Sequence, residues 1–230
     1  MNTYETSLIG HQEVAAGTRA FRFTKPPGFA FKPGQAITLF LLDPPPEANS
    51  KQRIFSLVSA PFEAELAVAT RMREGSAFKR ALKSLPAGAK LQLRGPRGAM
   101  TLHENRSRAA VFIAGGIGVT PFMSMLRQAA HDRLAQRLLL ICSNRRPEDT
   151  PFLAELQGLA LRYENFRMFA RMTERDGFVD AAAISSFVGD AAAPVFYLAG
   201  PPAMVDAMKA VLRGAGVGDA DVQSEQFYGY

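Results

Sequence analysis

A glycine-rich turn is the first stretch of this sequence whose residue types could do chemistry. Residues 114–122 read AGGIGVTPF, between an apolar run and a stretch with helical periodicity. Glycines let backbone N–H groups come close to a ligand, and a helix start adds unsatisfied donors that suit a pyrophosphate. Pro121 stands where the dinucleotide pattern G-x-G-x-x-G has its third glycine. Alone, the turn fits a nucleotide site and a tight structural connection about equally.

The first half of the chain has the pattern of β structure. Its apolar or alternating runs are short and are separated by turn residues such as Pro33–Gly34 and Pro86–Ala87–Gly88. They read RAFRFT, QAITLFLL, RIFSLVS, ELAVATRM and KLQLRG. Strands at this spacing predict a small antiparallel barrel. One helix is expected over residues 76–85, SAFKRALKSL, which Ser76 would open.

After the polar segment 103–108 the pattern changes to apolar strands that alternate with helices. The strands read AAVFIAG, RLLLICS, FRMFARM and PVFYLAG, and a last strand is expected in DVQSEQFYGY. Uniformly apolar strands are typical of a parallel sheet covered on both faces. Helix starts are indicated by a capping side chain or an early proline, at Thr120–Pro121, Thr150–Pro151, Asp180 and Pro201–Pro202.

The sequence therefore predicts two domains. An antiparallel β-barrel is expected over residues 1–104, and an α/β domain with a doubly wound parallel sheet over residues 105–230. The N-terminus lacks a signal-peptide pattern, and no apolar run is long enough to span a membrane. We therefore expect a cytoplasmic protein without membrane insertion.

Composition excludes several kinds of site. Cys142 is the only cysteine, so the chain itself can form neither a disulfide nor a cysteine-ligated iron–sulfur or zinc site. The three histidines are isolated, and we expect no metal. The formal net charge of +6 fits a face that attracts an acidic partner, or merely a solvated surface. The sequence has no nucleic-acid-binding signature.

Motifs along nearly the whole chain resemble those of the ferredoxin–NADP⁺ reductase superfamily. Its P-G-Q turn, R-x-[YF]-[ST] strand, phosphate-binding helix start and G-P-x-G strand are matched by FKPGQAITL, RIFSLVSAP, REGSAFKRAL and RGPRGAMTL. GGIGVTP is similar to its nucleotide turn, which has T-P in place of the third glycine. YLAGPPAMVDAM (197–208) and SEQF (224–227) resemble its later segments. Each motif is weak alone, but their common order makes the resemblance specific.

The resemblance implies an FAD site in the first half. Arg53 would bind the FAD pyrophosphate, Phe55 would lie against the isoalloxazine and ribityl chain, and the Ser56 hydroxyl would lie near flavin N5. Phe55 replaces the commoner tyrosine, which removes a hydroxyl donor to the ribityl chain. Two further groups are candidates: the helix start Gly75, Ser76, Ala77 and Phe78, and the strand end Val58 and Ser59. The alternatives are a capped surface helix and ordinary strand-end packing.

The second half would hold NAD(P)H on the residues Gly115, Gly116, Gly118, Val119, Thr120 and Pro121, with Gly200 and Pro201 shaping the nicotinamide pocket. Glu225 would be the carboxylate near the nicotinamide, unless it is only an exposed charge on the last strand. Phe227, or else Tyr230, would cover the flavin. Ala199 stands where many relatives have a cysteine, and Cys142 is expected to be a buried, inert thiol.

The residues after the second apolar strand of this half bear on NADH against NADPH. Ser143, Arg145 and Arg146 could hold a 2′-phosphate, with Arg171 and Arg175 as further cations. Glu148 or Asp149 could instead accept a hydrogen bond from a 2′-hydroxyl. Both readings stay open at this point.

The resemblance thus predicts a flavoprotein reductase that passes electrons from NAD(P)H through FAD to a separate acceptor. A ferredoxin or flavodoxin, an oxygenase component and free flavin are all candidates for the acceptor. The alternative is a non-catalytic flavin- or nucleotide-binding subunit, or a redox sensor.

Overall fold

The structure is a computed structural model that describes residues 2–47 and 50–228. The chain forms two compact units. The first consists of Met1–Thr101 with Thr120–Gln128, and the second of Leu102–Val119 with Ala129–Tyr230. The first unit's long segment ends three residues before the expected domain boundary.

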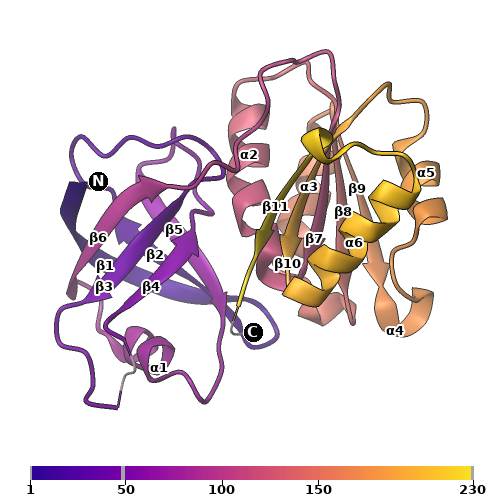
Figure 1. Cartoon of the computed structure of the whole chain (residues 1–230). Helices are drawn as coiled ribbons and strands as arrows, with labels where there is room; N and C mark the ends of the chain where they lie inside the picture. The colour runs from indigo at the N-terminus through magenta and orange to yellow at the C-terminus, as the bar shows by residue number, and fades with distance from the viewer. Residues whose placement is uncertain (1, 48–49, 229–230) are drawn as a thin grey trace. The chain divides into compact units, whose positions relative to one another are not determined.

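The first unit contains a six-stranded sheet in the order β4-β3-β6-β1-β2-β5, with every neighbouring pair antiparallel. Beyond β4, Leu57 pairs with Val68 of β5, so the two edges of the sheet meet. The predicted antiparallel barrel is therefore confirmed (Figure 1). The strands are β1 (Asn2–Ala15), β2 (Thr18–Thr24), β3 (Ala36–Leu41), β4 (Gln52–Ser56), β5 (Glu65–Arg71) and β6 (Lys90–Arg97).

Alternation along these strands builds the barrel core. Phe21 and Phe23 on β2, and Ile37 and Leu39 on β3, are fully buried. Each such side chain contributes about 1.5–3 kcal/mol relative to exposure. Strand β1 carries few apolar residues, and that is why the apolar pattern did not indicate it. Phe29 and Phe31 belong to the same cluster.

Helix α1 (Ala77–Ser84) lies within the same unit and ends close to the expected residue. The Ser76 hydroxyl accepts a hydrogen bond from the Lys79 backbone N–H at 3.4 Å, so the predicted cap is present. Phe78 and Leu82 insert into the barrel core. The helix expected from the sequence is therefore present, and the structure shows which of its side chains are buried.

The second unit contains a five-stranded parallel sheet in the order β11-β10-β7-β8-β9, as predicted for the second half. Its strands are β7 (Ala110–Gly115), β8 (Leu138–Asn144), β9 (Phe166–Met172), β10 (Val195–Gly200) and β11 (Val222–Gln226). Every residue of β7 and β10 is buried. Helices α5 (Ala181–Val188) and α6 (Pro202–Gly214) pack on one face through Ile184, Val205 and Leu212. Figure 1 shows α6 in front of the sheet.

The helix starts agree with the sequence except at α3. The Asp180 carboxylate accepts from the Ala183 N–H at 2.7 Å and caps α5 as expected. Helix α2 (Thr120–His131) follows a single 3₁₀ turn, η1 (Gly116–Val119). The predicted start of α3 at Thr150 is wrong. The Thr150 hydroxyl instead donates to the Arg146 carbonyl at 3.3 Å, and α3 (Leu153–Arg162) begins after Phe152, whose φ is 60°.

The polar segment 103–108 is anchored to the second unit. The Tyr197 hydroxyl lies 2.8 Å from both the backbone nitrogen and Nδ1 of His103. The Arg108 guanidinium pairs with Asp221 at 2.7 Å. Partial burial lowers the pKa of His103, which favours the neutral ring in these contacts. His103 therefore has a structural role in holding this segment.

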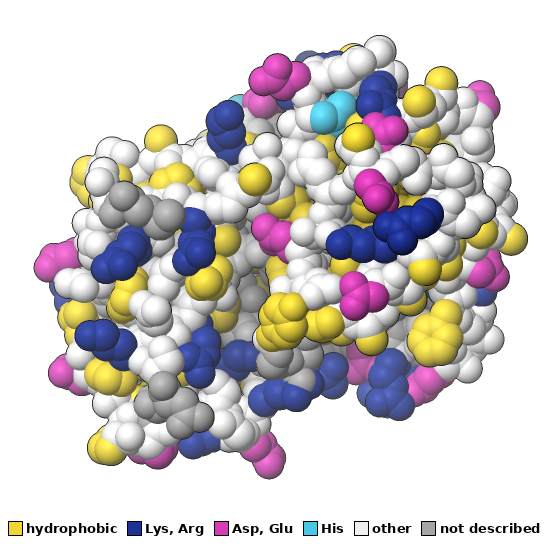
Figure 2. Space-filling model, viewed as in Figure 1, with side chains coloured by type: hydrophobic (Ala, Val, Ile, Leu, Met, Phe, Trp, Pro, Cys, Tyr) yellow, Lys and Arg dark blue, Asp and Glu magenta, His cyan; other side chains and the backbone are white. Residues whose placement is uncertain are grey.

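Charged side chains are interspersed on the face seen in Figure 2, with magenta carboxylates among the dark blue lysines and arginines. That distribution fits the solvated-surface interpretation of the net charge. In the described part of the chain, no helix is long and apolar enough to cross a membrane. No group of three or more His, Cys, Asp or Glu side chains gathers there in a way that could hold a metal.

Candidate active site

The barrel unit brings together three residues from the two motifs expected to bind FAD. Arg53 and Phe55 lie two residues apart on β4, and successive side chains of a strand point to opposite faces, so these two share one face. The Arg53 guanidinium carbon lies 5.5 Å from the centre of the Phe78 ring. The Phe55 and Phe78 ring centres are 6.2 Å apart. Both rings belong to the barrel core, while Arg53 is half-buried at its edge.

Ser56 is the buried polar side chain of this region. Its residue is 8% exposed, and no protein group in the described residues hydrogen-bonds to its hydroxyl. Buried polar groups in folded proteins almost always have partners, so an unpaired hydroxyl indicates a place for a ligand atom. The Ser56 hydroxyl thus fits the hydrogen-bond role that the sequence suggested beside a flavin ring.

A lysine that the sequence reasoning missed adds to the positive charge. Burial, then the charges of Arg73 and Arg53, lower the pKa of Lys79 to about 8. Its ammonium group donates to the Arg71 carbonyl at 2.9 Å, and no carboxylate is among the groups that shift its pKa. Three cations near one another, with no ion pair to a carboxylate of the described residues, suit an anionic ligand such as the diphosphate of FAD. The run of basic residues after β5 was the available signal.

The other barrel residues expected to bind FAD are placed as follows. A side chain at Gly75 would meet open space, and Ala77 is buried at the start of α1. The Val58 N–H donates to the Ala67 carbonyl at 2.8 Å, and the Ala67 N–H donates to the Ser59 hydroxyl at 2.9 Å. Val58 and Ser59 thus close the barrel against β5, which favours the strand-end interpretation. A role for them beside FAD stays a prediction.

In the second unit the glycine turn packs against the end of β10. A Cβ atom built on Gly118 would lie 2.1 Å from the Ala199 carbonyl oxygen, and one on Gly115 would lie 3.1 Å from the Pro201 ring. Gly116 has a φ of 55° and is the only partly exposed residue of the turn. The structure therefore packs Gly115 and Gly118 of the glycine turn against the predicted motif at the end of β10. Val119, Thr120 and Pro121 are buried where α2 begins.

Glu225 lies on β11, near the carboxyl end of the sheet where the glycine turn packs. It pairs with Ala199 in the register of β10 and β11, and the Phe227 N–H donates to the Gly200 carbonyl at 2.9 Å. No protein hydrogen bond or ion pair engages the Glu225 carboxyl within the described residues. Burial raises the pKa of Glu225, so this carboxyl holds its proton to higher pH than an exposed glutamate. Phe227 is half-buried beside it, and Tyr230 lies outside the described residues.

The residues that follow β8 form ion pairs. Ser143 lies opposite Gly115 in the sheet. Beyond the end of β8, the Arg146 Nε atom lies 3.0 Å from an oxygen of the Asp149 carboxylate. The Arg145 Nη2 atom lies 3.1 Å from an oxygen of the Glu174 carboxylate. Cys142 is buried within β8, as expected, and burial raises the pKa of its thiol to about 12, which favours the unreactive protonated form.

Known proteins identify the family of this arrangement. Residues 112–210 match the model of the oxidoreductase NAD-binding domain. The chain is 30% identical over 229 residues to ferredoxin–NADP reductase B of Sorangium cellulosum, covering 92% of this chain and 91% of that protein. The chain belongs to the ferredoxin–NADP reductase family. The expected resemblance is thereby confirmed.

Two further comparisons bear on the length and the fold. The reductase subunit of glycine betaine monooxygenase from Chromohalobacter salexigens is 27% identical to this chain, over 91% of this chain's length. The chain covers only about 60% of the length of that relative. The FAD/NAD-binding domain of nitric oxide dioxygenase from Vibrio cholerae superposes with a TM-score of 0.83 at 20% identity, covering 98% of this chain and 99% of that one. The family's two-domain fold therefore extends over the whole chain.

Proposed function

We propose that this chain is a flavoprotein reductase that takes hydride from NAD(P)H onto FAD and passes electrons to a separate acceptor. Membership of the ferredoxin–NADP reductase family supports the reaction class, and the NAD-binding domain supports the donor. We expect a ferredoxin, a flavodoxin or an oxygenase component as the acceptor, since one relative is a ferredoxin–NADP reductase and another is the reductase subunit of a monooxygenase. The protein would act in the cytoplasm, where NAD(P)H is available.

The buried Ser56 hydroxyl, which no protein group in the described residues engages, carries this proposal. Arg53 and Lys79 would neutralise the diphosphate of FAD, and the N–H groups at the start of α1 would add donors to it. The Ser56 hydroxyl would donate to the ring edge. Bound flavin supplies the ability to accept two electrons together and release them singly.

In the second unit, the glycine turn would receive the nucleotide pyrophosphate and Glu225 would face the nicotinamide. Burial raises the pKa of Glu225, so its carboxyl would keep a proton to higher pH than an exposed glutamate, and it could hydrogen-bond to the nicotinamide amide. The β10 segment at Ala199 and Gly200 fixes its position through the parallel register.

Reconstitution with FAD tests the proposal. The purified protein should take up FAD, turn yellow, and lose its visible flavin absorbance anaerobically when NADH or NADPH is added. Arg53→Ala should weaken FAD binding by about tenfold or more, since a charge-assisted contact contributes about 1.5–3 kcal/mol. Arg94→Ala is the matched control. It removes another barrel arginine that lies over a ring, 5.2 Å from the centre of Phe40, and should leave FAD affinity unchanged.

The outcomes separate the competing functions. Bound flavin that neither nucleotide reduces would support a non-catalytic subunit or sensor instead. Protein that takes up no FAD would refute the flavin site. Equal losses of affinity in Arg53→Ala and Arg94→Ala would show that only general positive charge matters, not the position of Arg53.

A further inference from the structure

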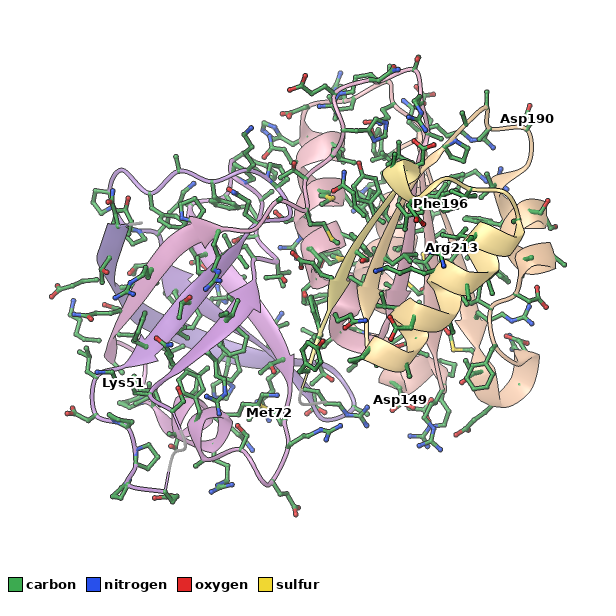
Figure 3. The ribbon with its side chains drawn as sticks, viewed as in Figure 1. Lys51, Met72, Asp149, Asp190, Phe196 and Arg213 are labelled. Carbon is green, nitrogen blue, oxygen red and sulfur yellow. The ribbon has the colours of Figure 1, made fainter. Side chains whose placement is uncertain are left out.

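The residues after β8 bear on which pyridine nucleotide the protein uses. In dinucleotide-binding sheets the ligand lies beyond the carboxyl ends of the strands, and the adenosine ribose lies near the end of the second strand. A carboxylate there accepts from a ribose 2′-hydroxyl, whereas an arginine there accommodates a 2′-phosphate. In this chain β8 is followed by Arg145, Arg146 and the turn η2 (Pro147–Asp149). Figure 3 shows Asp149 at one end of the second unit and Asp190 at the other.

Arg146 is held by Asp149 through two contacts. Its Nε and Nη2 atoms lie 3.0 and 3.3 Å from the two carboxylate oxygens, and Glu148 lies 3.4 Å from Nε. The Asp149 side chain is only 13% exposed. A phosphate could be held in a paired arrangement either by these two groups or by the Nη1 and Nη2 groups. Asp149 therefore already occupies one of the two edges of Arg146 that a 2′-phosphate could use.

Arg145 is engaged by the next strand end. Its Nη2 lies 3.1 Å from the Glu174 carboxylate, and the Glu174 N–H donates to the Arg145 carbonyl at 3.3 Å. Glu174 belongs to the short helix α4 (Thr173–Asp176), which directly follows β9. The hydrogen bond to Asp149, and then the charges of Asp149, Glu148 and Glu174, raise the pKa of Arg146. These three carboxylates thus all act on one guanidinium.

The remaining arginines of this edge are also occupied. Arg175 pairs with Asp176 at 2.7 Å, and the Arg171 guanidinium donates to the backbone carbonyls of Asp176 and Gly177. The edge thus carries four arginines and four carboxylates with no net charge. A 2′-phosphate, with a charge of about −1.5 to −2, would have to displace Asp149 or approach the carboxylates. A 2′-hydroxyl can instead donate to one of them.

We propose that the carboxylates Asp149 and Glu174, by occupying Arg146 and Arg145, make this protein select NADH over NADPH. The inference rests on the proposed function, since it assigns the donor of that same reaction. Individual surface ion pairs contribute only about 0–1 kcal/mol, so it is the accumulation of carboxylates at this edge that excludes the phosphate.

Binding of adenosine fragments tests the proposal without any redox reaction. Calorimetric titration of the full chain should give tighter binding of 5′-AMP than of its 2′-phosphorylated form, and of NAD⁺ than of NADP⁺ by about tenfold or more. Glu174→Gln and Glu148→Gln should each narrow that ratio by strengthening NADP⁺ binding. Both residues are exposed, and neither substitution should affect folding. Anaerobic flavin reduction by NADH and NADPH should follow the same ratios.

Asp190→Asn is the matched control. Asp190 pairs with Arg137 at 3.1 Å on the surface, at the other end of the unit, and its loss should leave the ratio unchanged. The proposal would be overturned if the wild-type protein bound NADP⁺ as tightly as NAD⁺ or more tightly. It would also be overturned if neither glutamine variant changed the ratio of NAD⁺ affinity to NADP⁺ affinity. Absence of binding by either nucleotide would instead overturn the proposed function itself.

Discussion

Gly118→Ala is the substitution whose effect the structure determines most directly. The new Cβ would lie 2.1 Å from the Ala199 carbonyl oxygen, 2.4 Å from its carbon and 2.7 Å from the Gly200 nitrogen. Ordinary contacts are 3.4–4 Å, and all three atoms are backbone atoms at the end of a central strand. No side-chain rotation can relieve the overlap, so β10 and the turn must separate.

Overpacking of a well-packed core costs about 1–3 kcal/mol, and a contact with fixed backbone belongs at the upper end of that range. A loss of about 3 kcal/mol corresponds to a fall in Tm of roughly 6–12 °C for a chain of this size. Circular dichroism during heating would measure that change. NAD⁺ affinity should fall as well, because the turn and Gly200 move together.

Gly214→Ala is the control for this prediction. It lies at the end of α6, its added Cβ would meet nothing within 4 Å, and its φ is not positive. Alanine there should leave Tm unchanged or raise stability by up to about 0.5–1 kcal/mol. A Tm for Gly118→Ala within roughly 1 °C of the wild type would refute the packing argument.

Two further predictions concern pH. The pKa of Lys79 is about 8 in the folded protein and 10.5 ordinarily, so between these pH values the unfolded chain binds more protons than the folded one. The free energy of unfolding of the protein without FAD should therefore increase as pH rises from 8 to 10.5. Lys79→Met should abolish that increase, as measured by urea titrations. Persistence of the gain in the variant would assign it to another group. Burial raises the pKa of Glu225, so the ionised carboxylate destabilises the folded protein. Glu225→Gln should therefore have a larger free energy of unfolding than the wild type at neutral pH. This difference in free energy should vanish as pH falls below about 4.5, where the carboxyl is protonated in both states. A constant difference down to pH 3 would contradict the role of burial.

The sequence by itself determined the elements whose signals are local. Ser76 and Asp180 cap the helices that they were expected to cap, because a cap depends only on the side chain and the next three residues. The apolar run FRMFARM became β9 with its expected bounds. The same locality explains the failure at Thr150. That residue has the features of a cap, but its hydroxyl bonds to the chain before it and the helix starts later. Motif order likewise identified the family and most of the candidate site residues.

Only the tertiary structure decided what those residues contact. Gly118 must be a glycine because of Ala199, about eighty residues further along the chain, and the parallel pairing of β7 with β10 creates that contact. The sequence left open whether Arg145 and Arg146 bind a 2′-phosphate, and only the structure shows that Glu174, which follows β9, pairs with Arg145. The pKa of Lys79 on α1 is lowered first by burial, then by the charge of Arg73, and then by the charge of Arg53 on β4. Parallel strands join residues through long crossover connections, so partners at one sheet edge are distant in sequence and leave no local pattern there.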